Sequence, residues 1–164
     1  SVDDLPPYED YAMEGRTYRY MTKEVLLPFG FGLSYTNFEY SNLNTEVKDD
    51  KLIISVELSN TGEVKAEEVV QLYVSSPLAG KGYPLYSLRA VHRESLEAGE
   101  SSIVKFDLDA TYFEQVNEEG ENFLPKGDYL ISVGGSIPSE RSVELGAAQW
   151  RTTTVSSKSL KKLQ

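Results

Sequence analysis

The chain contains no cysteine and a single histidine among its 164 residues. Disulfide frameworks and thiolate metal sites are therefore excluded, and cysteine usage gives no sign of a redox compartment. No apolar run is long enough to span a membrane, and the first ten residues, SVDDLPPYED, lack the basic start and apolar stretch of a secretory signal. Because no initiator methionine is present, we expect either that a leader was removed or that the chain is a piece of a longer protein. We expect no membrane partner.

Positive charge is also scarce. Sixteen Lys and Arg residues face 26 Asp and Glu residues, which gives a formal net charge of -10 and a pI near 4.6. Broad contact with a phosphate backbone needs clustered cations, so nucleic acid is not an expected partner. No asparagine stands in an N-x-[ST] motif. The hydrophobic share of 40% and the charged share of 26% are those of an ordinary folded protein, and the length fits one core.

What the sequence does contain is strand periodicity from Lys51 onward. KLIISVELSN alternates apolar and polar residues and ends at the turn signal Asn60-Thr61-Gly62. The same alternation of apolar and polar residues occurs in EEVVQLYVSS, SLRAVHRESL, SIVKFDLD and DYLISVGG. A plausible first strand is TNFEYSNL. Strands at this spacing without long helical segments predict an all-β, immunoglobulin-like (fibronectin type III-like) antiparallel β-sandwich over residues 36–146. Residues 110–126 could hold one helical turn and a short strand, and we interpret them as loop. We interpret residues 147–164 as a frayed polar tail.

Residues 1–35 have no such periodicity but are rich in aromatic side chains. Between Gly15 and Tyr40 there are seven aromatic residues and three glycines. Large rings left in water would expose much apolar area, so we expect an extended aromatic arm that packs on a neighbouring surface. The candidates for this interdomain packing are Arg16, Tyr18, Arg19, Tyr20, Phe29, Phe31 and Tyr35.

The arm and the sandwich together resemble a known family. DLPPYEDYAMEGRTYRY and LLPFGFGLSYTNFEYSNL, followed by VELSNTGEVKAEEVVQLYVSSP, LRAVHRESLEAGESSIVKFDLD and KGDYLISVGGS, are similar to the C-terminal region of family 3 glycoside hydrolases. In this resemblance residues 1–35 are the end of the preceding α/β domain, and a fibronectin type III-like domain follows. Ala66 and Arg89-Ala90-Val91 depart from the family pattern locally.

The resemblance implies a parent enzyme that hydrolyses β-glucosides or β-xylosides with retention of configuration, without a cofactor. Retention requires two carboxyl groups flanking the glycosidic bond, and in this family both lie in upstream domains. No residue of this chain inherits a catalytic role. The implied function is a non-catalytic domain that stabilises the enzyme and packs on its catalytic domains. The expected partners are the barrel and α/β domains of the same polypeptide, with a β-linked glycan as substrate of the parent enzyme. Members of the family are often exported, so the resemblance favours a secreted or periplasmic location.

The acidic residues and the histidine predict no catalytic or metal site in this chain. Glu67 and Glu68 are adjacent on a predicted strand and should point to opposite faces, so they form no catalytic pair. His92 reads as a strand residue, and Asp49-Asp50 lacks the alternating oxygen ligands of a calcium loop. We expect no metal site.

Two possibilities for glycan contact stay open. The tyrosines and Trp150 could form a stacking platform in a carbohydrate-binding or adhesion module. The loop of residues 75–87 is longer than a hairpin requires, and its Tyr83 and Tyr86 could reach a substrate or lie on a neighbouring domain.

Overall fold

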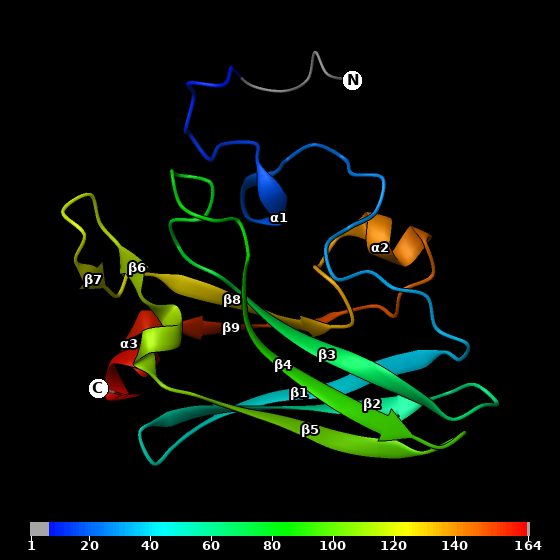
Figure 1. The fold of residues 1–164 in the computed structure, drawn as a ribbon. Coiled ribbons are helices and arrows are strands. Elements are labelled where there is room, and N and C mark those ends of the chain that lie inside the picture. Colours follow the sequence, from blue (N-terminus) through cyan, green and yellow to red (C-terminus); the bar gives the residue numbers. More distant parts are fainter. Residues whose placement is uncertain (1–6, 164) are drawn as a thin grey trace.

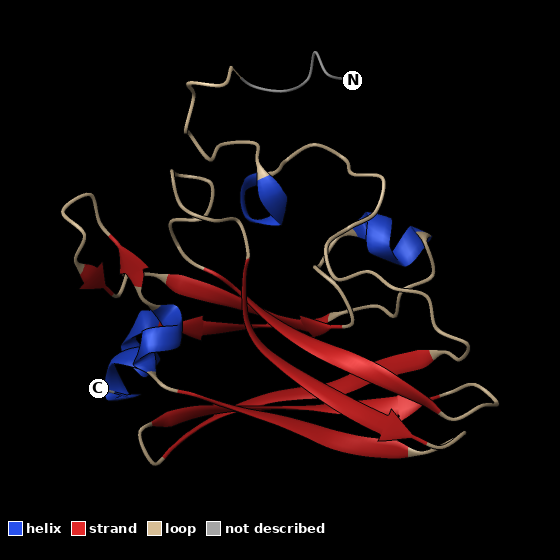
Figure 2. Ribbon diagram, in the orientation of Figure 1, coloured by secondary structure: helices blue, strands red, loops and turns tan. Residues whose placement is uncertain are grey.

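The computed structural model describes residues 7–163, which form a two-layer β-sandwich with an N-terminal arm over one face (Figure 1, Figure 2). One sheet has the strand order β1-β2-β5 and the other has the order β4-β3-β8-β9. All pairs within them are antiparallel. In chain order the elements are α1 (Thr17–Tyr20), β1 (Phe38–Lys48), β2 (Lys51–Asn60), β3 (Ala66–Ser75), β4 (Ser87–Leu96), β5 (Ser101–Leu108), η2 (Ala110–Phe113), β6 (Gln115–Val116), β7 (Asn122–Phe123), β8 (Asp128–Gly134), α2 (Glu140–Glu144), β9 (Arg151–Ser156), α3 (Ser157–Leu160) and η3 (Lys161–Leu163).

The core lies between the two sheets and follows the alternation read from the sequence. Every second residue of β2, from Leu52 to Leu58, is buried, and β5 and β8 contribute inward sets in the same way. Tyr129 of β8 closes one end of this core. Its hydroxyl donates to the carbonyl of Pro125 at 2.9 Å, and its ring meets Phe113 of η2 edge-on with centroids 5.7 Å apart. The prediction of an all-β antiparallel sandwich is confirmed.

Asp49 and Asp50 form the two-residue turn between β1 and β2. Both have positive φ, 50° and 57°, and the flanking residues Lys48 and Lys51 are paired. Two-residue hairpin loops favour residues that tolerate left-handed backbone, and aspartate is among them. Their position in this turn explains why two acidic residues stand side by side, and no bound cation is needed to explain them.

The C-terminal segment differs from the expectation of a frayed polar tail. Strand β9 pairs with β8 from Asp128↔Ser156 to Val133↔Arg151, and it forms an edge of the four-stranded sheet. Val155 and, in the turns that follow, Leu160 and Leu163 are buried in the core. The expectation was wrong because the threonines of RTTTVS were read as polar, whereas β-branched Thr suits a strand that faces water on one side.

Residues 110–126 are more ordered than the loop that was expected. They contain the 3₁₀ turn η2, capped by the Asp109 side chain, and the short hairpin β6–β7. The hairpin lies beside the loop between β3 and β4, where Tyr83 meets Phe123 edge-on at 6.2 Å. None of the helices formed by residues 7–163 is long and apolar enough to cross a bilayer.

Candidate functional site

The arm is attached to the outer face of the β4-β3-β8-β9 sheet by aromatic contacts. Tyr18 of α1 stacks on Phe29, with ring centroids 4.0 Å apart and an interplanar angle of 14°. The same ring meets Tyr73 of β3 edge-on at 6.3 Å. Tyr73 is fully buried although it points away from the sandwich core. The arm therefore covers an apolar spot that an uncovered sheet would expose.

Backbone hydrogen bonds fix the arm at two further points. The carbonyl of Arg19 accepts from the amide of Leu85 at 2.6 Å, and the carbonyl of Phe29 accepts from the amide of Ile137 at 3.0 Å. The Tyr18 hydroxyl accepts from the Leu88 amide at 3.3 Å. These bonds tie residues 17–30 to the β3–β4 loop on one side and to the segment after β8 on the other.

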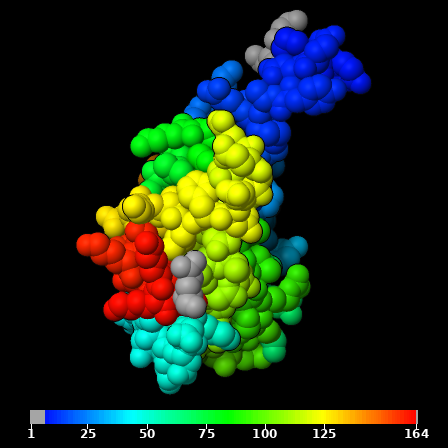
Figure 3. Space-filling model, turned by 90° about the vertical axis from the view of Figure 1, so that its left-hand side faces the viewer, coloured from blue at the N-terminus to red at the C-terminus, as the bar shows by residue number. Residues whose placement is uncertain are grey.

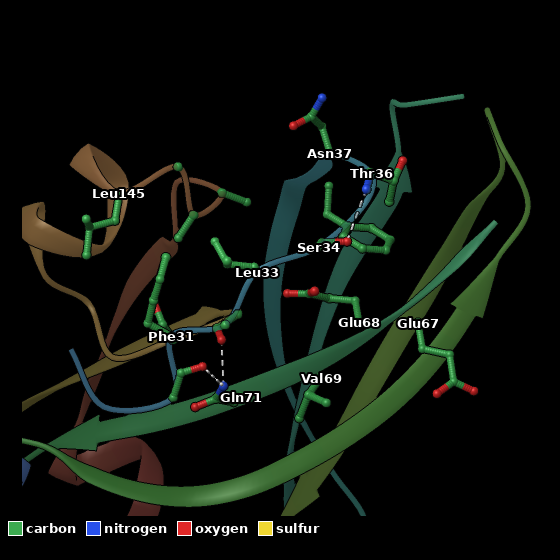
Figure 4. A pocket seen from close by; sticks show the side chains of 18 residues that line it. Phe31, Leu33, Ser34, Thr36, Asn37, Glu67, Glu68, Val69, Gln71 and Leu145 are labelled. Atoms are coloured by element: carbon green, nitrogen blue, oxygen red, sulfur yellow. Dashed lines mark hydrogen bonds between the residues drawn. The ribbon is translucent and has the colours of Figure 1, made fainter. Parts of the chain in front are cut away.

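Gln71 of β3 links the arm to the sheet through its side chain. Its Nε2 donates to the carbonyls of Gly135 at 2.6 Å and Gly30 at 3.3 Å (Figure 4). Its Oε1 accepts from the Tyr73 hydroxyl at 2.6 Å. Gly30 has a φ of +78°, and a Cβ there would clash with the Gln71 side chain. Glycine is required at position 30 both for its backbone angle and for this close approach.

A pocket of about 440 Å³ opens beside Gln71, between the end of the arm and the segment that follows α2. Figure 4 shows Glu68 of β3 pointing into this pocket, with Phe31 and Leu33 among its walls. The Tyr40 hydroxyl of β1 donates to Glu68 Oε1 at 2.8 Å, so the pair joins the two sheets. Burial raises the pKa of Glu68 more than the hydrogen bond from Tyr40 lowers it. Burial, followed by the charge of Glu68, raises the pKa of Tyr40 above its ordinary value.

The arm also carries many exposed apolar side chains. Among the described residues, eight of the fifteen exposed large apolar side chains lie between residues 8 and 35. Tyr35 is 100% exposed, Leu33 is 92% exposed and Tyr8 is 90% exposed. Figure 3 shows the start of the described arm projecting from the body of the sandwich. Such a concentration on one segment is typical of an interaction surface.

The structure divides the predicted interdomain candidates. Tyr18 and Arg19 contact the sandwich of their own chain, and Phe29, stacked on Tyr18, remains 44% exposed. Tyr35 is fully in solvent, and Arg16 forms an ion pair with Asp10 at 3.6 Å within the arm. The remaining two lie at cavities: Phe31 lines the Glu68 pocket, and Tyr20 lines a cavity beside the β3–β4 loop.

The loop of residues 75–87 supports the arm. Besides the bond from Leu85, its neighbour Ser87 accepts from Arg19 Nη2 at 3.3 Å. Tyr83 packs on Phe123, and Tyr86 lines a further hollow that it shares with Tyr18 and the α2 segment. A role of this loop toward a substrate stays a prediction.

The residues considered for chemistry are separated as expected. Glu67 pairs with Arg93 at 2.9 Å on the exposed side, whereas Glu68 bonds to Tyr40. His92 lies in β4, with its Nε2 2.8 Å from Glu94. Within residues 7–163 no cluster of three or more His, Asp or Glu side chains could hold a metal ion.

Gln71 and Tyr73 were missed by the sequence analysis as contact residues. Strand alternation places them on the face of β3 opposite Val70, Leu72 and Val74. The available signal was a tyrosine and a glutamine on that face within a strongly apolar strand. Their burial indicates that the outer face of β3 is covered.

Comparison with known proteins agrees with this architecture. The family described as "Fibronectin type III-like domain" matches residues 68–137. A xylan 1,4-beta-xylosidase of Xylanibacter ruminicola is 38% identical over 135 residues, which cover 80% of this chain and 15% of that protein. A beta-glucosidase of Kluyveromyces marxianus is 39% identical over 142 residues, which cover 83% of this chain and 16% of that protein. The crystal structure of a Bifidobacterium adolescentis GH3 beta-glucosidase superposes with a TM-score of 0.69 at 31% identity, over 84% of this chain and 20% of that one.

The chain corresponds to the C-terminal region of family 3 glycoside hydrolases. It carries the non-catalytic fibronectin type III-like domain of this family, as the resemblance implied. It spans between 15% and 20% of the length of these family 3 relatives, so it corresponds to one domain region of a larger glycosidase polypeptide.

Proposed function

We propose that this domain stabilises a retaining β-glycosidase by packing its arm against the catalytic domains of the same polypeptide. The observation that carries the proposal is the concentration of exposed apolar side chains on residues 8–35. The names of the relatives favour a β-glucoside or β-xyloside as the substrate of the parent enzyme.

The exposed residues of the arm allow a matched test in the parent enzyme. Substituting Leu33 and Tyr35 by serine removes exposed side chains only, so the 164-residue chain alone should keep its melting temperature. In the parent enzyme the same pair should lower the melting temperature, while the ratio of kcat/KM for glucoside and xyloside substrates stays constant. An altered ratio at unchanged stability would contradict the packing role and favour contact with the substrate.

The alternative is a carbohydrate-binding or adhesion module. In this alternative the exposed rings of Tyr8, Tyr11 and Tyr35 would stack on sugar rings. Pull-down of the 164-residue chain on insoluble xylan or cellulose separates the two functions. The packing role predicts no retention, and retention that disappears when these tyrosines are changed to alanine would favour the binding module.

A further inference from the structure

A second cavity of about 440 Å³ lies between the arm, the β3–β4 loop and the β6–β7 hairpin. Arg19, Lys81 and Arg89 all line it. None of the three forms an ion pair with a carboxylate in the part of the chain that the structure describes. Three unpaired cations around one cavity are unexpected in a chain whose acidic residues exceed its basic ones by ten.

The Arg89 side chain is held by one hydrogen bond, but one of its buried donors has no hydrogen-bond partner within the described chain. The pairing of β3 with β4 shifts between Leu72↔Ala90 and Tyr73↔Leu88, so Arg89 is the extra residue of a bulge. Bulges redirect side chains, often next to functional sites. Arg89 Nη2 donates to the carbonyl of Glu114 at 3.3 Å, whereas its buried Nε has no hydrogen-bond partner within the described chain. Burial and then the charge of Arg19 lower the pKa of Arg89.

The remaining walls limit what the cavity can hold. Tyr20 and Tyr83 supply aromatic surface, and the carboxylates of Glu114 and Glu118 also line the space. With three cations and two carboxylates, the lining keeps one net positive charge. This net charge favours an anion over a neutral ligand.

We propose that this cavity is a carboxylate-binding site in which Arg19 and Arg89 are the donors. A guanidinium presents its N–H groups in a planar fork that matches a carboxylate, and such charge-assisted bonds are the strong ones. The carboxylate belongs either to an acidic sugar or to an Asp or Glu side chain. The proposal does not depend on the packing role proposed above.

Arginine side-chain NMR tests the site directly on the 164-residue chain. The probes are sodium glucuronate and N-acetylglutamate α-amide, with glucose and N-acetylglutamine amide as neutral counterparts, at ionic strength held constant with sodium chloride. The Arg89 Nε–H resonance should shift saturably with the carboxylate probes and stay in place with the neutral ones. Tighter binding of glucuronate assigns the site to a sugar acid, and equal or tighter binding of the glutamate probe assigns it to a protein side chain.

Variants separate this site from general electrostatic attraction. Arg89→Gln and Arg19→Gln should each weaken binding about tenfold or more, because each removes charge-assisted hydrogen bonds. Arg93→Gln is the matched control, since Arg93 lies on the same strand but pairs with Glu67 on the exposed surface. Absence of a saturable shift, or equal weakening by all three variants, overturns the proposal. If Arg89→Gln fails to fold, Arg19→Gln decides the question.

Discussion

Replacing Tyr18 by alanine should destabilise the isolated 164-residue chain, because this ring joins the arm to the sheet. The change removes the stack on Phe29 and the edge contact with Tyr73, each contributing about 0.5–1.5 kcal/mol. It also removes the bond from the Leu88 amide, which contributes about 1 kcal/mol. We expect a loss of about 2–4 kcal/mol in the free energy of unfolding. At roughly 2–4 °C per kcal/mol for a chain of this size, the melting temperature should fall by about 4–16 °C.

Two further variants separate the contributions. Tyr18→Phe keeps the ring and loses the hydroxyl, so it should cost only about 1 kcal/mol. Tyr35→Ala changes a fully exposed ring of the same arm and should stay within about 0.5 kcal/mol of the parent sequence. The assay is urea unfolding followed by circular dichroism. If Tyr18→Ala and Tyr35→Ala unfold at the same urea concentration, the arm is not held by its own sheet and the reasoning fails.

Three other substitutions probe single interactions. Because burial raises the pKa of Glu68, the fold loses stability as the pH rises from about 4.5 through the raised pKa. Glu68→Gln should therefore stabilise the chain against urea unfolding at pH 8 but not at pH 3. Equal effects of the substitution at both pH values would refute burial as the cause. Tyr129→Phe leaves the buried carbonyl of Pro125 without its donor and should cost about 1–3 kcal/mol in the same assay, and a smaller loss would mean that water replaces the hydroxyl. Gly30→Ala strains a positive φ and clashes with Gln71, so hydrogen exchange at residues 17–30 should accelerate while the core strands stay protected.

The strands were predictable where one face meets the core and the other meets water. Leu52 through Leu58 alternate without exception, and this period of two also fixes which residues enter the sandwich. Strand β9 was not predictable in this way, because its outward residues Thr152 and Thr154 carry no apolar signal and its inward side has Val155 as its buried residue. Only the pairing with β8 reveals this strand.

The arm and its contacts were predictable in composition but not in position. Aromatic density between Gly15 and Tyr40 indicated that these rings need a partner surface. It did not indicate that Tyr73 and Gln71 of the same chain supply part of that surface. The bulge that presents Arg89 depends on a one-residue mismatch between β3 and β4, and hydrophobic alternation does not encode such a mismatch.

The route of the arm has a mechanical consequence. Residues 17–30 are fastened to the outer face of one sheet, and a few residues later the chain becomes β1 of the other sheet. The segment from Phe31 to Asn37 is therefore a strap across the open side of the sandwich. A force applied through the N-terminal end would load the bonds at Arg19 and Phe29 before it reached β1. A pulling experiment should therefore detach the arm first. Only then would the strap tighten and pass the force on to β1, which would shear the two sheets second.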